Sequence, residues 1–289
     1  MTFSATCWKR RLVVLAIAAS LPTGCGMAGS DLSAAVVCPP VAEYGAELQA
    51  AAAAEVETLP EDSASAVLLS DYAVMLASVG PPTPYTLLLA EHIAPIPGAT
   101  VIEIGTGSGI LAIVAALQGA ARVQVVDTNP AAIEAAVANA ELNGVADRIV
   151  PLSIGESIIP LPAGEMVDLA ISNAAQLPLP EAAEAHNPYY AGPDGRRMID
   201  AVIAAAPRHL APGGRLLMVL NSVTDFPASL ARMRSVGLEP RVLEERSLEL
   251  RPLFDRVWLD QLGGAARGLY SLRDGTAYET IYAVEARAR

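Results

Sequence analysis

The residues with the clearest chemical potential form a glycine-rich segment. The sequence VIEIGTGSG occupies residues 101–109, so an apolar stretch runs directly into Gly105, Gly107 and Gly109. Glycine lets backbone N–H groups approach a ligand without a clash from Cβ, and a helix that starts at such a turn favours a negative group. A dinucleotide-binding loop would have its third glycine one residue later, where this chain has Ile110. The spacing predicts a ligand-binding turn and disfavours the ordinary nicotinamide-binding motif.

Two acidic residues accompany this turn. Glu103 lies inside the apolar stretch, and Asp127 ends the next apolar stretch of the chain. An unpaired carboxylate at a buried strand end costs on the order of several kcal/mol, so we expect Glu103 to have a partner. A carboxylate at the position of Asp127 can accept hydrogen bonds from two ribose hydroxyls. The alternative for this segment is structural, with Asn129 or Asp127 capping a helix that begins near Pro130.

The elements that must position these residues alternate between short apolar strands and helices, which predicts a mostly parallel sheet with crossover helices. The expected strands span residues 101–104, 123–127, 149–152, 167–172, 215–220, 241–248 and 280–286. The expected helices between them span residues 110–117, 131–142, 195–209 and 226–236. Residues 252–277 fit no expected element. The predicted fold class is α/β, a Rossmann-like seven-stranded sheet with helices on both faces and a small N-terminal lobe.

The N-terminus has the layout of a secretory signal. Basic residues 9–11 precede an apolar run at 12–21, and Cys25 follows. The run is shorter than the roughly 20 residues of a spanning helix. Two interpretations stay open. In the first, the segment directs export and Cys25 is lipidated. In the second, the segment is an extension that is uncleaved or that precedes a true start at Met27.

We expect the chain to have four segments. They are a signal-like or extension segment at 1–26, a linker at 27–45, a helical and hairpin lobe at 46–96, and the main domain at 97–289. Within the lobe we expect a helix at 47–57, a strand at 71–79 and a helix at 85–93.

Charge and cysteine usage restrict the partners. The chain has 31 acidic and 19 basic residues and a formal charge of -12, which repels phosphate backbones, so we expect no nucleic acid partner. The three cysteines, Cys7, Cys25 and Cys38, have no metal-ligand spacing, so we expect no metal site.

Three segments support a resemblance to a known family. They are VIEIGTGSG at 101–109, VDTNPAAIEAAVANAELNGV at 126–145 and AGPDGRRMIDAVIAAAPRHLAPGG at 191–214. Residues 99–220 resemble class I S-adenosylmethionine-dependent methyltransferases and are most similar to the release-factor glutamine methyltransferases. The resemblance implies S-adenosylmethionine as the cofactor. Because that cofactor is made and kept in the cytoplasm, we expect a cytoplasmic protein, with export or anchoring through Cys25 as the alternative.

The resemblance also implies roles for single residues. Glu103 would anchor the methionine end of the cofactor, Asp127 would bind the ribose, and Glu156 would contact the adenine. The full expected cofactor-binding set is Glu103, Gly105, Thr106, Gly107, Gly109, Asp127, Thr128, Asn129, Glu156 and Asn173.

The acceptor motif departs from the family pattern. The glutamine methyltransferases follow their fourth strand with Asn-Pro-Pro-Tyr, whereas residues 173–176 here read Asn-Ala-Ala-Gln. We expect Asn173 and Gln176 to face the acceptor, without the rigid turn and the aromatic ring. Residues 187–190, Asn-Pro-Tyr-Tyr, repeat the pattern 14 residues later, and a tyrosine there is a candidate replacement for the ring. His186 is a candidate base, with a solvated loop residue as the alternative.

The resulting hypothesis is a methyltransferase that acts on nitrogen or oxygen of a small molecule or a protein side chain. A catalytically inactive S-adenosylmethionine-binding protein is the first alternative, because the acceptor motif is altered. A NAD(P)-dependent oxidoreductase is the second alternative, because a glycine turn and an acidic residue also occur in that class.

Overall fold

The computed structural model describes residues 82–94, 96–152, 164–181, 189–251 and 254–288, together with three strands nearer the N-terminus. The chain separates into two compact units, Met1–Pro81 and Pro82–Arg289. In the first unit, β1 (Val14–Ile17), β2 (Ser65–Leu69) and β3 (Tyr72–Leu76) form an antiparallel sheet. The strand expected at 71–79 is therefore β3. Most of the predicted leader, the linker and the helix expected at 47–57 lie outside the described residues.

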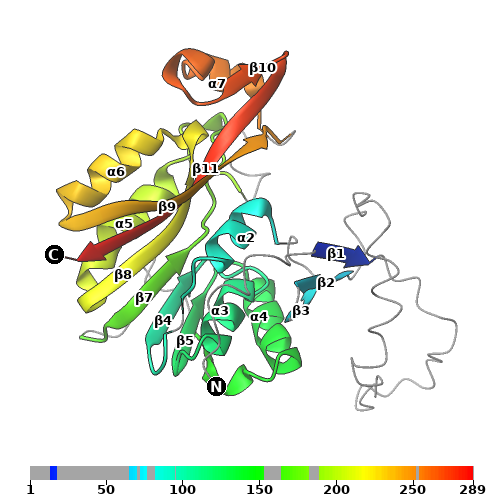
Figure 1. Ribbon diagram of the computed structural model, residues 1–289, viewed down its shortest axis with the longest axis vertical. Coiled ribbons are helices and arrows are strands. Elements are labelled where there is room, and N and C mark those ends of the chain that lie inside the picture. Colours follow the sequence, from blue (N-terminus) through cyan, green and yellow to red (C-terminus); the bar gives the residue numbers. More distant parts are fainter. Residues whose placement is uncertain are drawn as a thin grey trace, which may run out of the picture. The chain divides into compact units, whose positions relative to one another are not determined.

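The second unit is built on an eight-stranded sheet (Figure 1). Neighbouring strands follow the order β10-β11-β8-β7-β4-β5-β6, and β9 pairs with the other edge of β11. The run β8-β7-β4-β5-β6 is parallel, whereas β11 is antiparallel to each of its partners. The strands are β4 (Thr100–Ile104), β5 (Arg122–Val126), β6 (Ile149–Pro151), β7 (Val167–Ser172), β8 (Leu210–Asn221), β9 (Leu238–Glu249), β10 (Ser271–Arg273) and β11 (Thr276–Ala288). The predicted α/β class with a mostly parallel sheet is confirmed.

Helices cover both faces of this sheet (Figure 1). They are α2 (Pro84–Ala90), α3 (Ile110–Leu117), α4 (Pro130–Leu142), α5 (Arg197–Ala205), α6 (Phe226–Ser235) and α7 (Arg256–Gln261), with short 3-10 turns η3 (Ala146–Arg148), η5 (Ala206–Arg208), η6 (Ser222–Thr224) and η7 (Gly264–Arg267). Side chains of α5 and α6 pack with Ile102 and Ile104 of β4. Because strand residues alternate between faces, Glu103 points to the opposite side, where α3 lies.

The structure corrects three details of the prediction. The sheet has an eighth strand, β10, which comes from the segment 252–277 that fitted no expected element. The helix expected at 195–209 ends at Ala205 and continues as η5, because Pro207 lacks the N–H that an α-helix needs. Helix α2, expected in the N-terminal lobe, belongs to the second unit, where it contacts β8, β11 and α3. The other predicted domain limits stay predictions.

Gly109 is the point of closest approach between the glycine turn and α4. It has a φ of +80°, and a Cβ atom there would lie 2.7 Å from the Cα of Ala136. We expect Gly109→Ala to lower the free energy of unfolding by about 1–3 kcal/mol through overpacking, in addition to backbone strain. Gly98→Ala is the matched control, because Gly98 has a φ of +77° and nothing within 4 Å of its Cβ position. Urea denaturation of both variants measures the difference, and equal losses would show that Ala136 gives way without cost.

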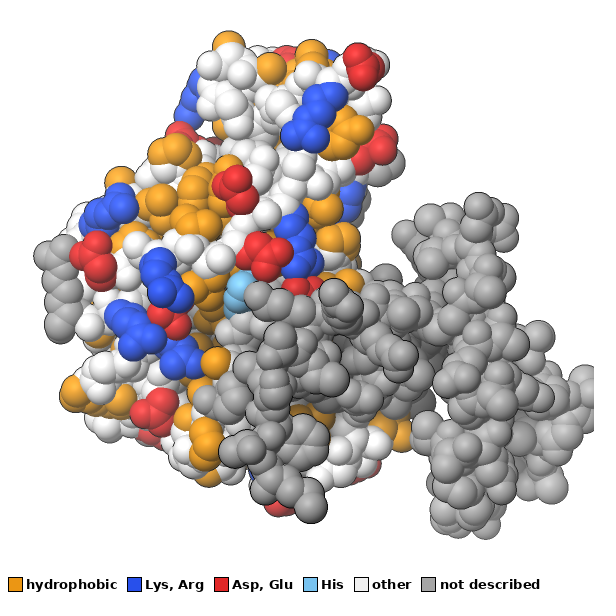
Figure 2. All heavy atoms as spheres, in the orientation of Figure 1, with side chains coloured by type: hydrophobic (Ala, Val, Ile, Leu, Met, Phe, Trp, Pro, Cys, Tyr) orange, Lys and Arg blue, Asp and Glu red, His pale blue; other side chains and the backbone are white. Residues whose placement is uncertain are grey.

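Three general features of the described residues complete the fold. Figure 2 shows acidic and basic side chains interspersed on one face of the second unit. Among the described residues, no group of three His, Cys, Asp or Glu side chains is arranged to hold a metal ion. None of the described helices is both long enough and apolar enough for a membrane span.

Candidate cofactor and acceptor site

Most of the predicted site residues lie at the carboxyl ends of three adjacent strands, β4, β5 and β7. After β4 the chain forms the neighbouring strand β5 on one side, and later β7 on the other side. This reversal is a topological switch point, where open α/β sheets bind ligands. The turns after β4 and β7 touch each other there, since a Cβ on Gly105 would lie 3.6 Å from the Cα of Ala174. The structure therefore brings the glycine turn, Asp127 and Asn173 to one edge of the sheet.

Asp127 holds the glycine turn in place. Its Oδ2 accepts a hydrogen bond from the N–H of Gly107 at 3.0 Å, and its Oδ1 accepts one from the N–H of Asn129 at 2.9 Å. The side chain is half-buried, and each carboxylate oxygen has a further lone pair. Asn129 caps α4 through the N–H of Ala131, so the capping role considered for this segment belongs to Asn129. Asp127 can thus bind ribose hydroxyls while it supports the turn.

Glu103 is a buried carboxyl group with two local donors. Its Oε2 accepts from the hydroxyl of Thr106 at 2.7 Å and from the N–H of Ala112 at 3.0 Å. Burial raises the pKa of Glu103 to about 8, and the carboxylate of Asp127 adds to this rise, while the two hydrogen bonds act against it. The partners expected for Glu103 are therefore Thr106 of the glycine turn and the first turn of α3. An ammonium group nearby would stabilise the ionised form.

These residues fit an amino-acid nucleoside such as S-adenosylmethionine. Gly105 is exposed, and a Cβ at Gly107 would meet no atom within 4 Å, so the backbone of the turn faces open space. Glu103 would hold the ammonium of the methionine end, and Asp127 would hold the ribose. Thr106 contributes to the site through its bond to Glu103, and Thr128 is exposed beside Asp127. Glu156, expected at the adenine, lies outside the described residues.

The two expected acceptor residues differ in their surroundings. Asn173 is half-buried, and its Nδ2 donates to the hydroxyl of Thr86 in α2 at 3.0 Å, so its Oδ1 can accept from an acceptor N–H. Gln176 is buried, and its Nε2 donates to the carbonyl of Val219 at 3.1 Å, while its Oε1 has no hydrogen-bond partner. Asn173 is thus the better placed of the two to contact an acceptor.

Tyr189 and Tyr190, from the Asn-Pro-Tyr-Tyr segment, lie beside the acceptor turn. The N–H of Leu177 donates to the carbonyl of Tyr189, and the N–H of Ala191 donates to the carbonyl of Leu177, both at 3.1 Å. Tyr189 is 53% exposed. Tyr189 therefore lies near the place of the missing aromatic residue, although the segment comes late in the sequence. His186 lies outside the described residues.

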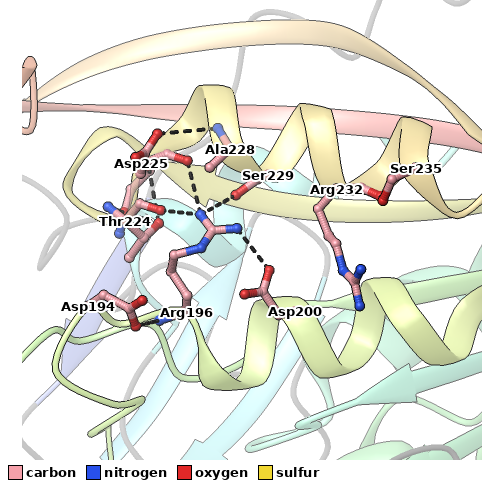
Figure 3. A network of polar contacts seen from close by, with 10 residues as sticks. Asp194, Arg196, Asp200, Thr224, Asp225, Ala228, Ser229, Arg232 and Ser235 are labelled. Carbon is pink, nitrogen blue, oxygen red and sulfur yellow. Dashed lines mark hydrogen bonds and ion pairs between the residues drawn. The ribbon is translucent and has the colours of Figure 1, made fainter.

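Arg196 orders the loop that follows β8 (Figure 3). Its guanidinium donates to the carbonyls of Thr224 and Asp225, to the hydroxyl of Ser229 and to the carboxylate of Asp200. Gly195 packs closely against Thr224, where a Cβ atom would lie 2.8 Å from the Thr224 methyl group. The sequence motif at 191–197 therefore supports the strand end next to the acceptor turn.

Residues 83–189 match the family model described as ribosomal protein L11 methyltransferase (PrmA). This part of the chain is therefore similar to PrmA-type methyltransferases. A ribosomal protein L11 methyltransferase of Methylococcus capsulatus is 33% identical over 64% of this chain and 55% of its own length. A release factor glutamine methyltransferase of Cereibacter sphaeroides is 36% identical over 49% of this chain and 53% of its own length. The chain thus spans about half the length of these two relatives.

A solved structure supports the α/β fold described above. P. horikoshii TYW2 in complex with MeSAdo aligns with a TM-score of 0.50 at 13% identity, over 80% of this chain and 74% of that chain. At this identity the likeness shows the fold alone. The resemblance to class I methyltransferases that the sequence motifs predicted is confirmed.

The structure also identifies site residues that sequence reasoning missed. Thr86 lies in the first turn of α2. Its hydroxyl accepts hydrogen bonds from Nδ2 of Asn173 and from the N–H of Thr83, the latter at 3.2 Å. The sequence Thr-Pro-Tyr-Thr at 83–86 indicates a capped helix start, but not its proximity to the acceptor turn. Tyr85, Asn221 and Glu279 form a further buried group beside it.

Proposed function

We propose that this chain is an S-adenosylmethionine-dependent methyltransferase whose acceptor is a protein side chain. One observation supports this most strongly. Glu103 near the end of β4, Asp127 after β5 and Asn173 after β7 lie at the switch point of the sheet, together with the glycine turn. An ammonium site, a ribose site and an amide for the acceptor then lie along one edge.

The cofactor supplies an electrophilic methyl group when it is bound. The protein therefore has to align the acceptor and give one proton a place to go. The carboxylate of Glu103 holds the ammonium of the methionine end, and Asp127 accepts from the ribose hydroxyls. Asn173 uses Oδ1 to hold an N–H of the acceptor, because its Nδ2 donates to Thr86.

A protein acceptor is favoured over a small molecule by the relatives. The two relatives described above are named for ribosomal protein L11 and for release factor glutamine. The acceptor turn is compatible with an extended side chain, because Ala174 and Ala175 are small and Tyr189 is exposed next to the turn. No comparison supports a NAD(P)-dependent oxidoreductase or a catalytically inactive S-adenosylmethionine-binding protein.

Transfer of a labelled methyl group tests this proposal. We expect tritium from S-adenosyl-[methyl-³H]methionine to enter purified ribosomal protein L11 or purified release factor. Asn173→Ala should lower kcat by roughly 100-fold, because misplacing a reacting group is known to cost about that much. Asn143→Ala, at the end of α4, is the matched control. Binding of the cofactor without label in either protein would refute the protein side-chain acceptor.

A further inference from the structure

A buried phenol and carboxylate pair lies next to the acceptor turn and takes no part in the cofactor site. The hydroxyl of Tyr85 in α2 donates to Oε2 of Glu279 in β11. The same hydroxyl accepts from Nδ2 of Asn221, at the carboxyl end of β8, at 3.0 Å. Tyr85 is 2% exposed and Glu279 is 0% exposed. Three elements from distant parts of the sequence therefore meet at one buried hydroxyl.

The carboxyl group of Glu279 is incompletely paired. Its Oε1 has no hydrogen-bond partner, and the Nε of Arg251, which also has none, lies 3.8 Å away. The guanidinium of Arg251 stacks instead over the ring of Tyr85, at 4.7 Å from the centroid. A buried and incompletely paired acid destabilises a fold, and such groups concentrate at functional sites. Burial raises the pKa of Glu279 to about 7, against the effects of Tyr85 and Arg251.

The pair is linked directly to the acceptor residue. Thr86 follows Tyr85 in the first turn of α2, and its hydroxyl accepts from Nδ2 of Asn173. Helix α2 has only seven residues, so a short segment must present Tyr85 to Glu279 and Thr86 to Asn173 at the same time. Any rotation of α2 that breaks the first contact also moves the second.

The loop after β8 supports the same hydroxyl from the other side. Oδ1 of Asn221 accepts from the N–H and the hydroxyl of Thr224, at 3.1 and 2.9 Å. The carbonyl of Thr224 in turn accepts from Arg196. The amide of Asn221 is thereby oriented with Nδ2 toward Tyr85.

We propose that Tyr85 and Glu279 are positioning residues of the acceptor site, which fix the first turn of α2 and through Thr86 set the orientation of the Asn173 amide. The inference rests on the proposed function, because it takes Asn173 as the residue that meets the acceptor. Neither Tyr85 nor Glu279 has to touch the acceptor for this role.

The positioning depends on the ionisation of Glu279. The ionised carboxylate accepts a charge-assisted hydrogen bond from Tyr85, which is roughly twice as strong as a neutral one. Protonation of Glu279 weakens this bond and loosens α2. Among the described residues, the charged or titratable groups that face Glu279 are Tyr85 of α2 and Arg251 after β9, and Asn221 of β8 is the neutral neighbour of Tyr85. The orientation of Asn173 should therefore follow pH through the neutral range.

Nuclear magnetic resonance of the side-chain amide of Asn173 tests this link without an acceptor. The signal is assigned by its loss in Asn173→Asp and is followed from mildly acidic to mildly alkaline pH. We expect it to shift with a midpoint near the pKa of Glu279, and we expect Glu279→Gln and Tyr85→Phe to abolish that shift. The controls are Glu285→Gln and Tyr282→Phe, which remove a carboxylate and a hydroxyl from the same strand, β11, outside this group. They should leave the shift unchanged.

The outcomes separate the two proposals. An Asn173 signal that ignores pH, or that titrates equally in Glu279→Gln and Tyr85→Phe, overturns the positioning role. Isothermal titration of the same variants with S-adenosylmethionine should give the affinity of the unmodified protein, because Glu103 and Asp127 lie on other strands. Failure of the unmodified protein to bind the cofactor refutes the proposed function, whatever the Asn173 signal does.

Discussion

Replacing Asp127 with alanine is expected to weaken S-adenosylmethionine binding by roughly 100-fold. Each hydrogen bond to a charged group contributes about 1.5–3 kcal/mol, and two ribose hydroxyls would lose their shared acceptor. The variant also leaves the N–H groups of Gly107 and Asn129 without the carboxylate that accepts their hydrogen bonds in the unmodified protein. A loss of about 2.7 kcal/mol corresponds to a 100-fold change in Kd. Isothermal titration measures it.

Asp168→Ala is the matched control for this experiment. Asp168 also accepts one backbone N–H, from Thr100 at 2.9 Å, but it lies at the amino ends of β4 and β7. Its removal should leave the affinity unchanged. If Asp127→Ala binds as well as Asp168→Ala, Asp127 does not bind the ribose and serves only the glycine turn.

The affinity for S-adenosylmethionine should rise with pH through the ionisation of Glu103. The pKa of Glu103 is raised to about 8, so the empty site is mostly protonated at neutral pH. Binding of an ammonium group requires the ionised form, and the proton has to leave. We expect affinity to rise roughly tenfold for each pH unit between about pH 6 and about pH 7.5, until the ligand's own α-amino group begins to lose its proton.

Glu103→Gln provides the control, because glutamine keeps the size of the side chain and cannot ionise. Its affinity should be lower than that of the unmodified protein at mildly alkaline pH and nearly independent of pH. The unmodified protein without ligand should also lose stability as pH rises from the ordinary value of 4.5 toward about 8, since its folded state binds the extra proton in that window. A pH dependence that persists in Glu103→Gln would assign the proton to another group.

Local pattern was sufficient to predict the parallel half of the sheet and the proximity of Glu103 and Asp127. The helix predicted at 110–117 is α3 and the strand predicted at 167–172 is β7, with the same limits. Their ends are set by local chemistry, since the glycine turn begins α3 and the apolar run of β7 stops at Ser172. Glu103 and Asp127 end up at one edge because parallel strands place their carboxyl ends together.

The acceptor side could not be derived in the same way. The hydrogen bond between Tyr85 and Glu279 joins residues 194 positions apart, and it exists because β11 inserts antiparallel between β8 and β9. The strand expected at 280–286 began one residue after Glu279. One signal was present, since Glu279 shares the period-two spacing of the buried Ile281 and Ala283, which points a carboxylate inward.

Isothermal titration of the unmodified protein with S-adenosylmethionine tests the central claim most directly. The arrangement of Glu103, the glycine turn and Asp127 predicts a single site that binds the cofactor and releases a proton near neutral pH. The proton release can be read from titrations in buffers of different ionisation enthalpy. Absence of binding at millimolar S-adenosylmethionine would contradict the assignment of this edge of the sheet as a cofactor site.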